Sequence, residues 1–342
     1  MTAARELTIG VLSGDPDLPY SYGVDGRFSA EDIAAATTVA TTVNALDGYR
    51  AVAFNNHSEL LDTLRQNPPD LALNFCDTGY RNLLHHEPNV PALLELLDIP
   101  YTGATPASMA LCADKALVRL LAASHGIPVP NETVVDLHAD PLVLPDLYPA
   151  MIKPNDGCGS LGVSPQSVVH DAAEAQACLR RLAEEATAVR PRALIQDFLT
   201  GAEYTLGLVG NPDTGLTVLP PLEIDYSQLD PSLPPILSYG SKADPDSPYW
   251  QALQFRRAEL DTGTRAAMVE QAIWLFERLG FRDYARLDFR AGADGVPRLL
   301  DANFNPTWNH DGKMAIMAGW AGHSYGDLLR MILEAARRRY GL

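Results

Sequence analysis

The segment from Tyr284 to Pro306 constrains the fold more than any other part of the chain. It contains two runs of alternating polar and apolar residues, separated by the turn residues Gly292, Asp294 and Gly295. A period of two residues is typical of strands with one buried face, and a short Gly/Asp-rich loop joins such strands as a hairpin. The segment therefore predicts an antiparallel β-hairpin.

The two faces of this hairpin differ in chemistry. We expect one face to enter the core and the other to carry polar groups: Leu287, Phe289, Leu300 and Ala302 inside, and Arg286, Asp288, Arg290, Asp301 and Asn303 outside. Two carboxylates and an amide oxygen suit Mg²⁺, with Mn²⁺ as a substitute, when phosphates and water supply the other ligands. A solvated hairpin face with ordinary acids is the alternative interpretation.

Length and charge limit the classes of protein to consider. A chain of 342 residues is long enough for two or three domains. Its net charge of -17 argues against nucleic acid and anionic membranes as partners, since both need a basic surface. The same charge does not exclude ATP, because a few local Lys and Arg residues can hold phosphates.

Cysteine spacing and hydropathy suggest the compartment. The chain has 4 cysteines, widely spaced and without a Cys-x-x-Cys pair, which favours reduced thiols. No charged and apolar leader opens the sequence, and no apolar run approaches the ~18 residues of a membrane span. We therefore expect a soluble, cytoplasmic protein.

The N-terminal third alternates between strand and helix patterns. Predicted strands cover 7–12, 52–54 and 71–75, and predicted helices cover 29–46, 57–64 and 91–97. This order is typical of a parallel sheet with helices on its faces, in a domain that ends near Gly103. Ser29 and Asp32 form a capping-box pattern. Glu31 between them either complements the helix dipole or faces a ligand.

The middle of the chain contains a glycine-rich loop. A helix capped by Thr105 is expected to carry Lys115 near its centre, and a strand then ends at Lys153. The glycines that follow spell Gly-x-Gly-x-x-Gly, from position 157 to 162. Pro165 and a helix that starts only near Asp171 exclude the dinucleotide fingerprint, and the P-loop would need a closing Gly-Lys-Ser/Thr. Either the loop amides wrap phosphates beside Lys153, or this is an ordinary turn.

The segment from Asp225 to Pro248 is rich in Pro, Ser, Asp and Gly, with Tyr239 and Lys242 embedded in it. An irregular run of this length inside a compact enzyme is usually a lid or a binding loop. Further strands are expected at 193–199 and 204–208, and further helices at 171–186, 264–279 and 328–339.

The order of these parts resembles the ATP-grasp superfamily, and within it the D-alanine–D-alanine ligase group, over nearly the whole chain. The resemblance rests on these motifs: Ser29 to Glu31, Pro100 to Gly103, Ala113 to Lys115, Met151 to Pro154, Gln196 to Leu199, Glu203, Lys242, Arg286, Asp288, Asp301 and Asn303.

The resemblance implies roles for these positions. Lys115, Lys153, Gly157, Gly159 and Lys242 would contact the nucleotide phosphates, and Gln196, Asp197, Phe198 and Leu199 would hold adenine. Glu203 would bind the ribose hydroxyls. Arg286 would stabilise the oxyanion, and Asp288, Asp301 and Asn303 would bind magnesium.

Three segments depart from the family pattern. In the family, the first of two adjacent serines ties the loop to the substrate glutamate, but Gly159-Ser160 stands here, so only the second hydroxyl remains. Ala243 replaces the tyrosine after Lys242, and we expect the hydrogen-bonded link between the loops and Glu31 to be rearranged. The acceptor-binding serine and its small neighbours give way to the bulkier segment 307–313. We therefore predict an acceptor pocket formed by Trp308, His310, Gly312 and Lys313. In this pocket Trp308 shapes the wall, and Lys313 or His310 holds a polar or anionic group. The alternatives are that Lys313 points into water at the start of the next helix and that His310 is an ordinary polar loop residue.

From the resemblance we expect an α/β protein with an N-terminal Rossmann-like parallel sheet, residues 1–104, and two α+β ATP-grasp subdomains, 105–195 and 196–342, that clamp ATP. The implied activity joins a small-molecule carboxylate to an amine through an acyl phosphate, giving ADP and phosphate, with a substrate other than plain D-alanine. A cell-wall D-alanine–D-alanine ligase and a non-catalytic ATP-binding regulatory module are the alternatives. The resemblance also favours a homodimer.

Overall fold

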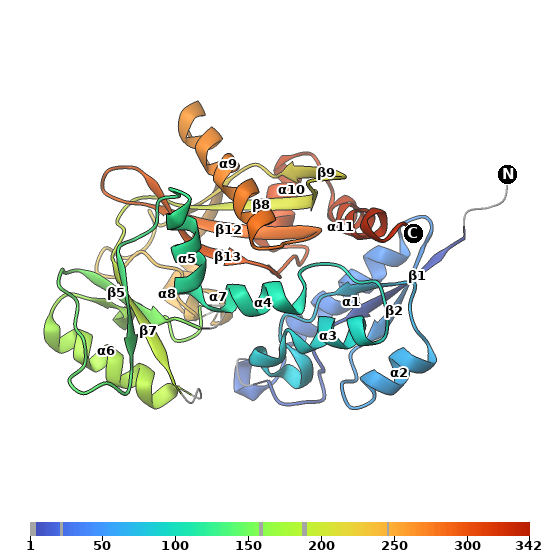
Figure 1. The fold of residues 1–342 in the computed structure, drawn as a ribbon, viewed down its shortest axis with the longest axis horizontal. Coiled ribbons are helices and arrows are strands. Elements are labelled where there is room, and N and C mark those ends of the chain that lie inside the picture. The colour runs from blue at the N-terminus through green and yellow to red at the C-terminus, as the bar shows by residue number, and fades with distance from the viewer. Residues whose placement is uncertain (1–4, 21–22, 157–159, 187–189, 245) are drawn as a thin grey trace.

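The computed structural model describes residues 5–20, 23–156, 160–186, 190–244 and 246–342. These residues form three sheets with helices packed on them. Figure 1 shows the N-terminal sheet at one end of the molecule and the sheet with β5 and β7 at the other, with the largest sheet above and between them.

The N-terminal sheet is parallel, with the strand order β2-β1-β3. Its elements are β1 (Leu7–Leu12), α1 (Ala30–Asn44), β2 (Tyr49–Phe54), α2 (Leu60–Gln66), β3 (Leu71–Asn74) and α3 (Asn89–Leu96). The predicted capping box is present, because Ser29 and Asp32 bond to each other's backbone N–H. The predicted fold class is confirmed here.

Helix α2 begins later than predicted because His57 belongs to the preceding loop. The His57 backbone N–H donates to Asp15 Oδ2 at 2.8 Å, and its buried ring contacts the Ser13 carbonyl oxygen at 2.9 Å. The prediction of a helix from His57 is therefore wrong by about a turn, since the side chain serves long-range contacts.

The single helix predicted around Lys115 is two helices, α4 (Pro106–Ala113) and α5 (Lys115–Ser124). Asp114 between them is extended, at φ -88 and ψ 97, and its side chain accepts a hydrogen bond from the Leu117 N–H. It also forms an isolated bridge with Asp156. Lys115 is thus the first residue of α5 and not the centre of a helix.

The sheet at the other end is antiparallel, in the order β4-β7-β5-β6. Its elements are β4 (Glu132–Asp136), β5 (Ala150–Pro154), β6 (Val168–Val169), α6 (Ala172–Glu185) and β7 (Arg192–Asp197). Helix α6 covers one face with the buried stripe Ala175, Leu179 and Leu182. The boundary predicted between residues 195 and 196 falls inside β7.

The largest sheet has six strands in the order β11-β10-β8-β12-β13, with β9 beside β8. Its strands are β8 (Glu203–Asn211), β9 (Gly215–Val218), β10 (Leu222–Asp225), β11 (Gln254–Arg257), β12 (Tyr284–Ala291) and β13 (Pro297–Asn303). Its helices are α9 (Thr262–Arg278), α10 (Lys313–Trp320) and α11 (Tyr325–Tyr340). Side chains of α5 and α9 share one core with β8, β12 and β13, and side chains of α10 and α11 share another with the N-terminal sheet.

The predicted hairpin is confirmed as β12 and β13, but it contains a bulge. Asp288 pairs with Asp301, whereas the next residue, Phe289, pairs with Leu299, so that Leu300 is an extra residue. A bulge presents two successive side chains to nearly the same side. The prediction that Leu300 enters the core is therefore wrong: Leu299 is fully buried, and Leu300 lines the cleft described below.

The predicted lid segment contains the short helix α7 (Gly240–Ala243), and a second short helix, α8 (Pro248–Ala252), begins at its last residue. The segment lies against the sheet that contains β5 and β6, because its residues Leu229 and Ile236 pack with Val168, as does Tyr249 of α8. The Tyr239 N–H also donates to the Val163 carbonyl oxygen at 3.1 Å.

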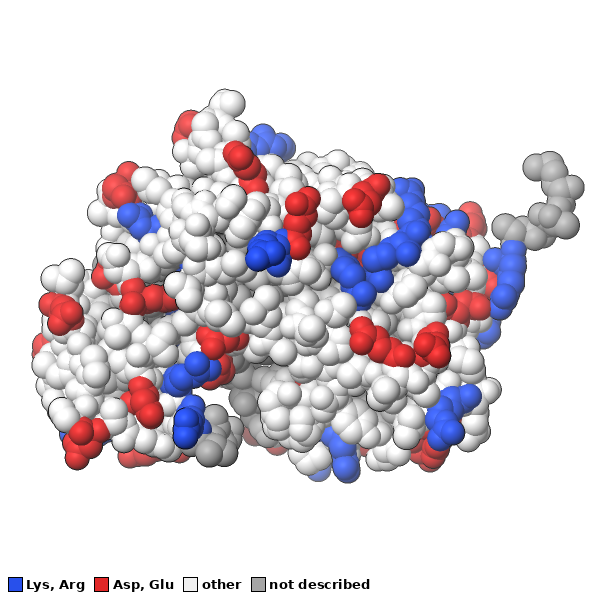
Figure 2. Space-filling view, viewed as in Figure 1, with Lys and Arg blue, Asp and Glu red and all other residues white. Residues whose placement is uncertain are grey.

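On the face shown in Figure 2, basic and acidic side chains are interspersed. Among the described residues, no helix combines the length and apolar character needed to cross a membrane.

Candidate functional site

A cleft lies where the four-stranded and six-stranded sheets meet. Twenty-two residues line it: Lys115, Met151, Lys153, Pro154, Asp156, Ser160, Leu161, Val163, Gln196, Asp197, Phe198, Leu199, Glu203, Ile236, Leu237, Arg286, Asp288, Arg290, Leu300, Asp301, Asn303 and Lys313. Most of the residues predicted for nucleotide and metal binding are in this set.

The floor of the cleft is the polar face of three adjacent strands. Across β8, β12 and β13, Thr205 pairs with Asp288, and Asp288 pairs with Asp301. Two residue pairs further along the hairpin, Arg286 lies opposite Asn303. The alternation predicted for the hairpin thus brings its polar side chains together, with Thr205 added from β8.

Asp288 is the most highly coordinated acid of the site. Its carboxylate accepts hydrogen bonds from Arg286 Nε at 3.1 Å and Nη2 at 3.0 Å, from Thr205 Oγ1 at 2.8 Å and from Asn303 Nδ2 at 2.9 Å. Burial alone would raise the pKa of Asp288, but the charges of Arg286 and Lys313 hold it well below the ordinary value. Asp288 is therefore ionised at neutral pH.

Asp301 has a different counter-charge. Its Oδ2 lies 2.7 Å from Lys115 Nζ, which reaches it from the first turn of α5. Burial would raise the pKa of Asp301, but Lys115 and Lys153 lower it. Burial in turn lowers the pKa of Lys153 to about 7, with Arg119 and Lys115 adding to the effect. The cleft therefore contains closely spaced charges of both signs.

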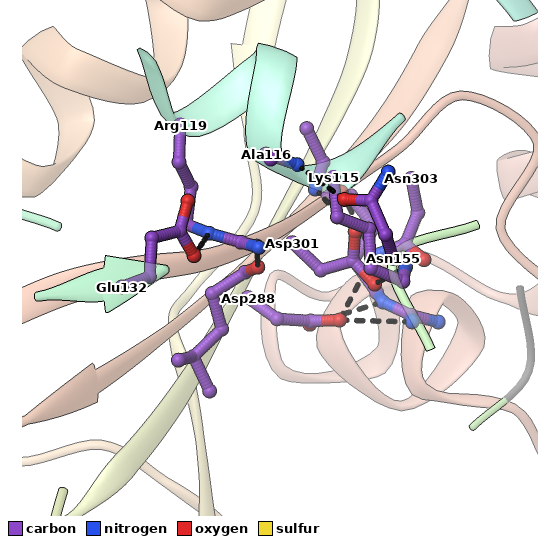
Figure 3. A network of polar contacts seen from close by, with 11 residues as sticks. Lys115, Ala116, Arg119, Glu132, Asn155, Asp288, Asp301 and Asn303 are labelled. Atoms are coloured by element: carbon purple, nitrogen blue, oxygen red, sulfur yellow. Dashed lines mark hydrogen bonds and ion pairs between the residues drawn. The ribbon is translucent and has the colours of Figure 1, made fainter. Parts of the chain in front are cut away.

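A buried network behind the cleft positions β13. Arg119 lies one helical turn after Lys115, and its guanidinium donates to Glu132 Oε2 at 2.7 Å and to the Leu300 carbonyl oxygen at 2.5 Å. Gln196 Nε2 donates to the same Glu132 oxygen at 2.5 Å. Figure 3 shows Arg119 and Glu132 pointing toward each other beside the strand that carries Asp301. Helix α5 thus contacts both Leu300, through Arg119, and Asp301, through Lys115.

Asn155 fixes the start of α5. It is fully buried, its Oδ1 accepts from the Ala116 N–H at 3.0 Å, and its Nδ2 donates to Asp114 Oδ1 at 3.0 Å. These bonds join the end of β5, which carries Lys153, to the helix that carries Lys115 (Figure 3). The two lysines are therefore held by one local framework.

Lys313 is the first residue of α10, and it faces the cleft. Its Nζ lies 3.4 Å from Thr205 Oγ1 and 5.6 Å from the centre of the Phe255 ring. Gly207 allows this close approach, since a Cβ there would lie 2.8 Å from Met314 Sδ of α10. Burial lowers the pKa of Lys313, while Asp288 acts in the opposite direction.

The donor set of Asp288, Asp301 and Asn303 fits a hard divalent cation. Asn303 directs Nδ2 at Asp288 Oδ2 and at the Arg286 carbonyl oxygen, so its Oδ1 remains available as a ligand. Two carboxylates and one amide oxygen are the donors that Mg²⁺ prefers, and phosphates can supply the rest. Among the described residues, no cluster of three or more His, Cys, Asp and Glu side chains suits a metal, so this set depends on the amide.

Several predicted residues lie elsewhere. Trp308 was predicted to form a pocket wall, but it is 1% exposed and packs on Phe75 and Tyr284, because the segment after Asn303 turns into the interface with the N-terminal sheet. Exposed His310 lies 4.0 Å from Asp311, and neither it nor Gly312, the N-cap of α10, lines the cleft. Glu31 is also exposed and outside the cleft lining.

Part of the predicted phosphate loop falls outside the described residues, namely Gly157 and Gly159. Ser160 is described, lines the cleft and has a left-handed φ of 64. For Lys242 the structure describes only the backbone, in α7.

Sequence reasoning missed Thr205, Asn155 and Arg119. Thr205 follows Glu203 by two residues, so strand alternation already placed both on one face. Arg119 follows Lys115 by four residues, which places both on one side of a helix. Asn155 had no such signal, because its role depends on contacts with α5.

Comparison with known proteins gives concordant results. Residues 137–334 match the protein family described as D-ala D-ala ligase C-terminus. A protein of Sinorhizobium fredii, the uncharacterized protein y4sG, is 29% identical over 86% of this chain and 84% of its own length. A D-alanine–D-alanine ligase of Bordetella petrii is 27% identical over 71% of this chain and 70% of its own.

Among solved structures, the chain is similar in fold to a D-alanine–D-alanine ligase from Bacillus anthracis, complexed with ATP. The TM-score is 0.73 at 22% identity, over 98% of this chain and 99% of that one.

Proposed function

This chain belongs to the D-alanine–D-alanine ligase family, and on that premise we propose that it joins a carboxylate substrate to an amine substrate through an acyl phosphate. It is an ATP-dependent, ADP-forming ligase of the ATP-grasp type. The observation that best supports the reaction is one cleft in which Lys115 pairs with Asp301 and Arg286 pairs with Asp288.

In the first step, an oxygen of the donor carboxylate attacks the γ-phosphorus of ATP. The bond from that phosphorus to the β,γ-bridging oxygen breaks, and ADP leaves with the electron pair. Lys115 and Lys153 balance the phosphate charge, because both line the cleft. Bound by Asp288, Asp301 and Asn303, Mg²⁺ or Mn²⁺ would supply charge neutralisation at the phosphate oxygens.

In the second step, the amine attacks the acyl carbon, loses a proton, and displaces inorganic phosphate. Arg286 uses Nε and Nη2 to hold Asp288, and its Nη1 donates no hydrogen bond to a described residue. That nitrogen is free to stabilise the tetrahedral oxyanion. Ser160 and the segment that carries Lys242 would keep water away from the acyl phosphate.

Product analysis tests this chemistry. Attack at the γ-phosphorus predicts ADP and inorganic phosphate in equal amounts with the amide. A screen of amino acids and small carboxylates, with ADP detection and mass analysis of the amide, identifies the substrates at the same time. Stoichiometric AMP and pyrophosphate would contradict the acyl-phosphate route.

We propose that the acceptor carries an anionic or polar group that pairs with Lys313. Lys313 combines cleft exposure with a weak hydrogen bond to Thr205 at 3.4 Å, so its charge is available to a ligand. The proposal favours an acceptor other than plain D-alanine, whereas relatives named D-alanine–D-alanine ligase favour D-alanine itself as the second candidate.

The variant Lys313→Met distinguishes the role of this lysine. Loss of a charged hydrogen bond should raise the acceptor KM by roughly 10-fold or more and leave the ATP KM nearly unchanged. His310→Gln, measured in parallel, tests the other predicted contact and should change neither constant, since His310 lies outside the cleft lining. Unaltered acceptor kinetics in Lys313→Met would return the lysine to a structural role.

The organisation of the assembly belongs to the same proposal. We propose that the chain has three domains. The N-terminal domain ends at about residue 104, and the boundary between the central and C-terminal domains lies after β7, so that this strand belongs wholly to the central domain. A homodimer is expected from the family, and the molar mass in solution from light scattering checks it.

A further inference from the structure

A buried ion pair lies in the cleft two residues along β12 from the proposed metal ligand Asp288. Arg290 and Glu203 are direct cross-strand partners in β12 and β8. Arg290 Nη1 lies 3.2 Å from Glu203 Oε2 and donates to the Pro235 carbonyl oxygen at 2.6 Å. Both residues line the cleft, and each is only 5% exposed.

Within the described part of the chain, hydrogen-bond donors occupy one carboxylate oxygen of Glu203 and leave the other open. The Tyr226 hydroxyl donates to the same Oε2 at 2.8 Å, so the two lone pairs of that oxygen are filled. The described residues donate no hydrogen bond to Oε1. The Arg290 guanidinium is also fixed by ring contacts, at 5.3 Å from the Phe198 centroid and 5.6 Å from that of Tyr226.

Folding stability does not explain this arrangement. Arg290 Nε is buried and has no hydrogen-bond partner among the described residues, which is costly for a charged group. Buried ion pairs are in general weak evidence for stability, since desolvation offsets their attraction. A pair that keeps an unsatisfied donor while lining a ligand cleft indicates a functional constraint on the carboxylate.

We propose that Arg290 and Tyr226 are positioning residues that hold Glu203 with only Oε1 available, so that the site reads a single hydroxyl of the ribose of ATP. The inference rests on the proposed function, in which this cleft binds ATP. A carboxylate with both oxygens open could accept from the 2′- and 3′-hydroxyls together. Here the second oxygen is used by the protein, and one hydroxyl remains without a charged acceptor.

The same guanidinium links the ribose site to the segment from Asp225 to Pro248. Its bond to the Pro235 carbonyl oxygen, at 2.6 Å, is shorter than its 3.2 Å bond to Glu203, and Ile236 and Leu237 follow directly in the cleft lining. Loss of the guanidinium therefore frees the carboxylate to rotate and releases this part of the segment.

Binding of nucleotide analogues tests the inference without knowledge of the amine substrate. Isothermal titration calorimetry compares ATP, 2′-deoxyATP and 3′-deoxyATP on the full chain. One hydrogen bond to a carboxylate is worth roughly 10- to 100-fold in affinity. We expect one analogue to bind at least about 10-fold more weakly than ATP and the other to stay within about threefold. Equal effects of both analogues overturn the inference alone, whereas absence of ATP binding overturns the proposed function with it.

Variants separate positioning from general stability. Arg290→Met should bring the two analogues within about threefold of each other, because the carboxylate is no longer held, and Arg290→Lys should keep part of the asymmetry. Arg298→Met is the matched control, since Arg298 pairs with Asp294 on the same hairpin but does not line the cleft. This control variant should leave the ratio of the affinities for the two analogues as it is in wild type.

Should Arg290→Met fail to fold, Tyr226→Phe provides the second test. The substitution opens one lone pair on Oε2 while the ion pair remains, so that the second ribose hydroxyl can also be bound. The analogue that binds wild type nearly as well as ATP should therefore bind this variant more weakly than ATP does. An unchanged asymmetry in both Arg290→Met and Tyr226→Phe overturns the proposal.

Discussion

The two acids at the centre of the cleft are held by different means. Asp288 is surrounded by four donor atoms from three side chains, whereas Asp301 Oδ2 has Lys115 as its partner at 2.7 Å. A cation that enters the site would therefore compete with one lysine for Asp301 and with a complete set of donors for Asp288. Metal binding at Asp301 would therefore displace fewer existing hydrogen bonds than metal binding at Asp288.

Replacing Asp301 tests whether it is a ligand. Asp301→Asn removes the charge that pairs with Lys115 and with the metal, and turnover should fall by at least about 100-fold. Thermal unfolding of the variant should stay close to that of wild type, because the amide keeps the shape. The control is Asp294→Asn in the turn of the same hairpin, which should retain full activity. Near-normal turnover of Asp301→Asn at saturating Mg²⁺ would exclude the ligand role.

The pKa of Lys153 gives ATP binding a predictable pH dependence. With a pKa of about 7, caused first by burial, this lysine is mostly neutral at pH 8 in the free protein. A bound triphosphate raises the pKa and charges the lysine, so binding takes up a proton. The affinity for ATP should therefore fall as pH rises above about 7. Calorimetry at pH 8 in buffers of different ionisation enthalpy measures the proton uptake.

Lys153→Arg is the matched control for this prediction, because arginine stays charged throughout this range. The variant should bind ATP without the extra proton uptake. If wild type and Lys153→Arg take up the same number of protons, Lys153 is charged before ATP arrives.

At the scale of elements, the junction of α4 and α5 determines where Lys115 lies. Asp114 caps α5 through the Leu117 N–H at 3.0 Å and bonds to Asn155 and Arg192. The sequence around it has the helix pattern of a single element, so a break was not expected. The interruption depends on Asp156 and Asn155, which come about 40 residues later in the chain.

Removing this cap should affect stability and nucleotide binding together. Asp114→Ala should lower the free energy of unfolding by about 1 kcal/mol, the usual value of an N-cap. It should also raise the ATP KM at least about threefold, because Lys115 is the next residue. Asp114→Asn keeps an oxygen acceptor and should show less than half of either effect. Equal losses in both variants would assign the effect to charge instead of capping.

Local signals predicted the elements whose contacts are local. The Ser29 cap and the hairpin of β12 and β13 were both found in this way, since capping and alternation involve residues close in sequence. The bulge at Leu300 was not, because it depends on the pairing with Phe289 and on the Arg119 guanidinium. The burial of Trp308 was not expected for the same reason, as only the fold brings Phe75 against it.

At the scale of the whole molecule, one buried acid joins parts that are far apart in sequence. Asp283 is fully buried, and its carboxylate accepts from the Gly103 N–H at 2.9 Å, from Asn211 Nδ2 at 2.9 Å and from Arg339 Nη2 at 2.6 Å. It thereby connects the end of the N-terminal part, strand β8 and helix α11. The order of the three sheets could be predicted from sequence, but this junction could not, because Asp283 itself lies in no motif.

Arg339 should consequently contribute more to stability than its neighbours on α11. Its guanidinium holds both oxygens of Asp283 and donates to the Tyr101 carbonyl oxygen at 2.8 Å. Arg339→Met leaves a buried carboxylate without its counter-charge, and the free energy of unfolding should fall by about 3 kcal/mol. Arg338→Met is the matched control, because that exposed residue makes one long bond, 3.4 Å, to the Thr214 carbonyl oxygen. It should change stability by less than about 0.5 kcal/mol. Urea unfolding monitored by tryptophan fluorescence measures both, and equal midpoints for the two variants would show that Asp283 does not depend on Arg339.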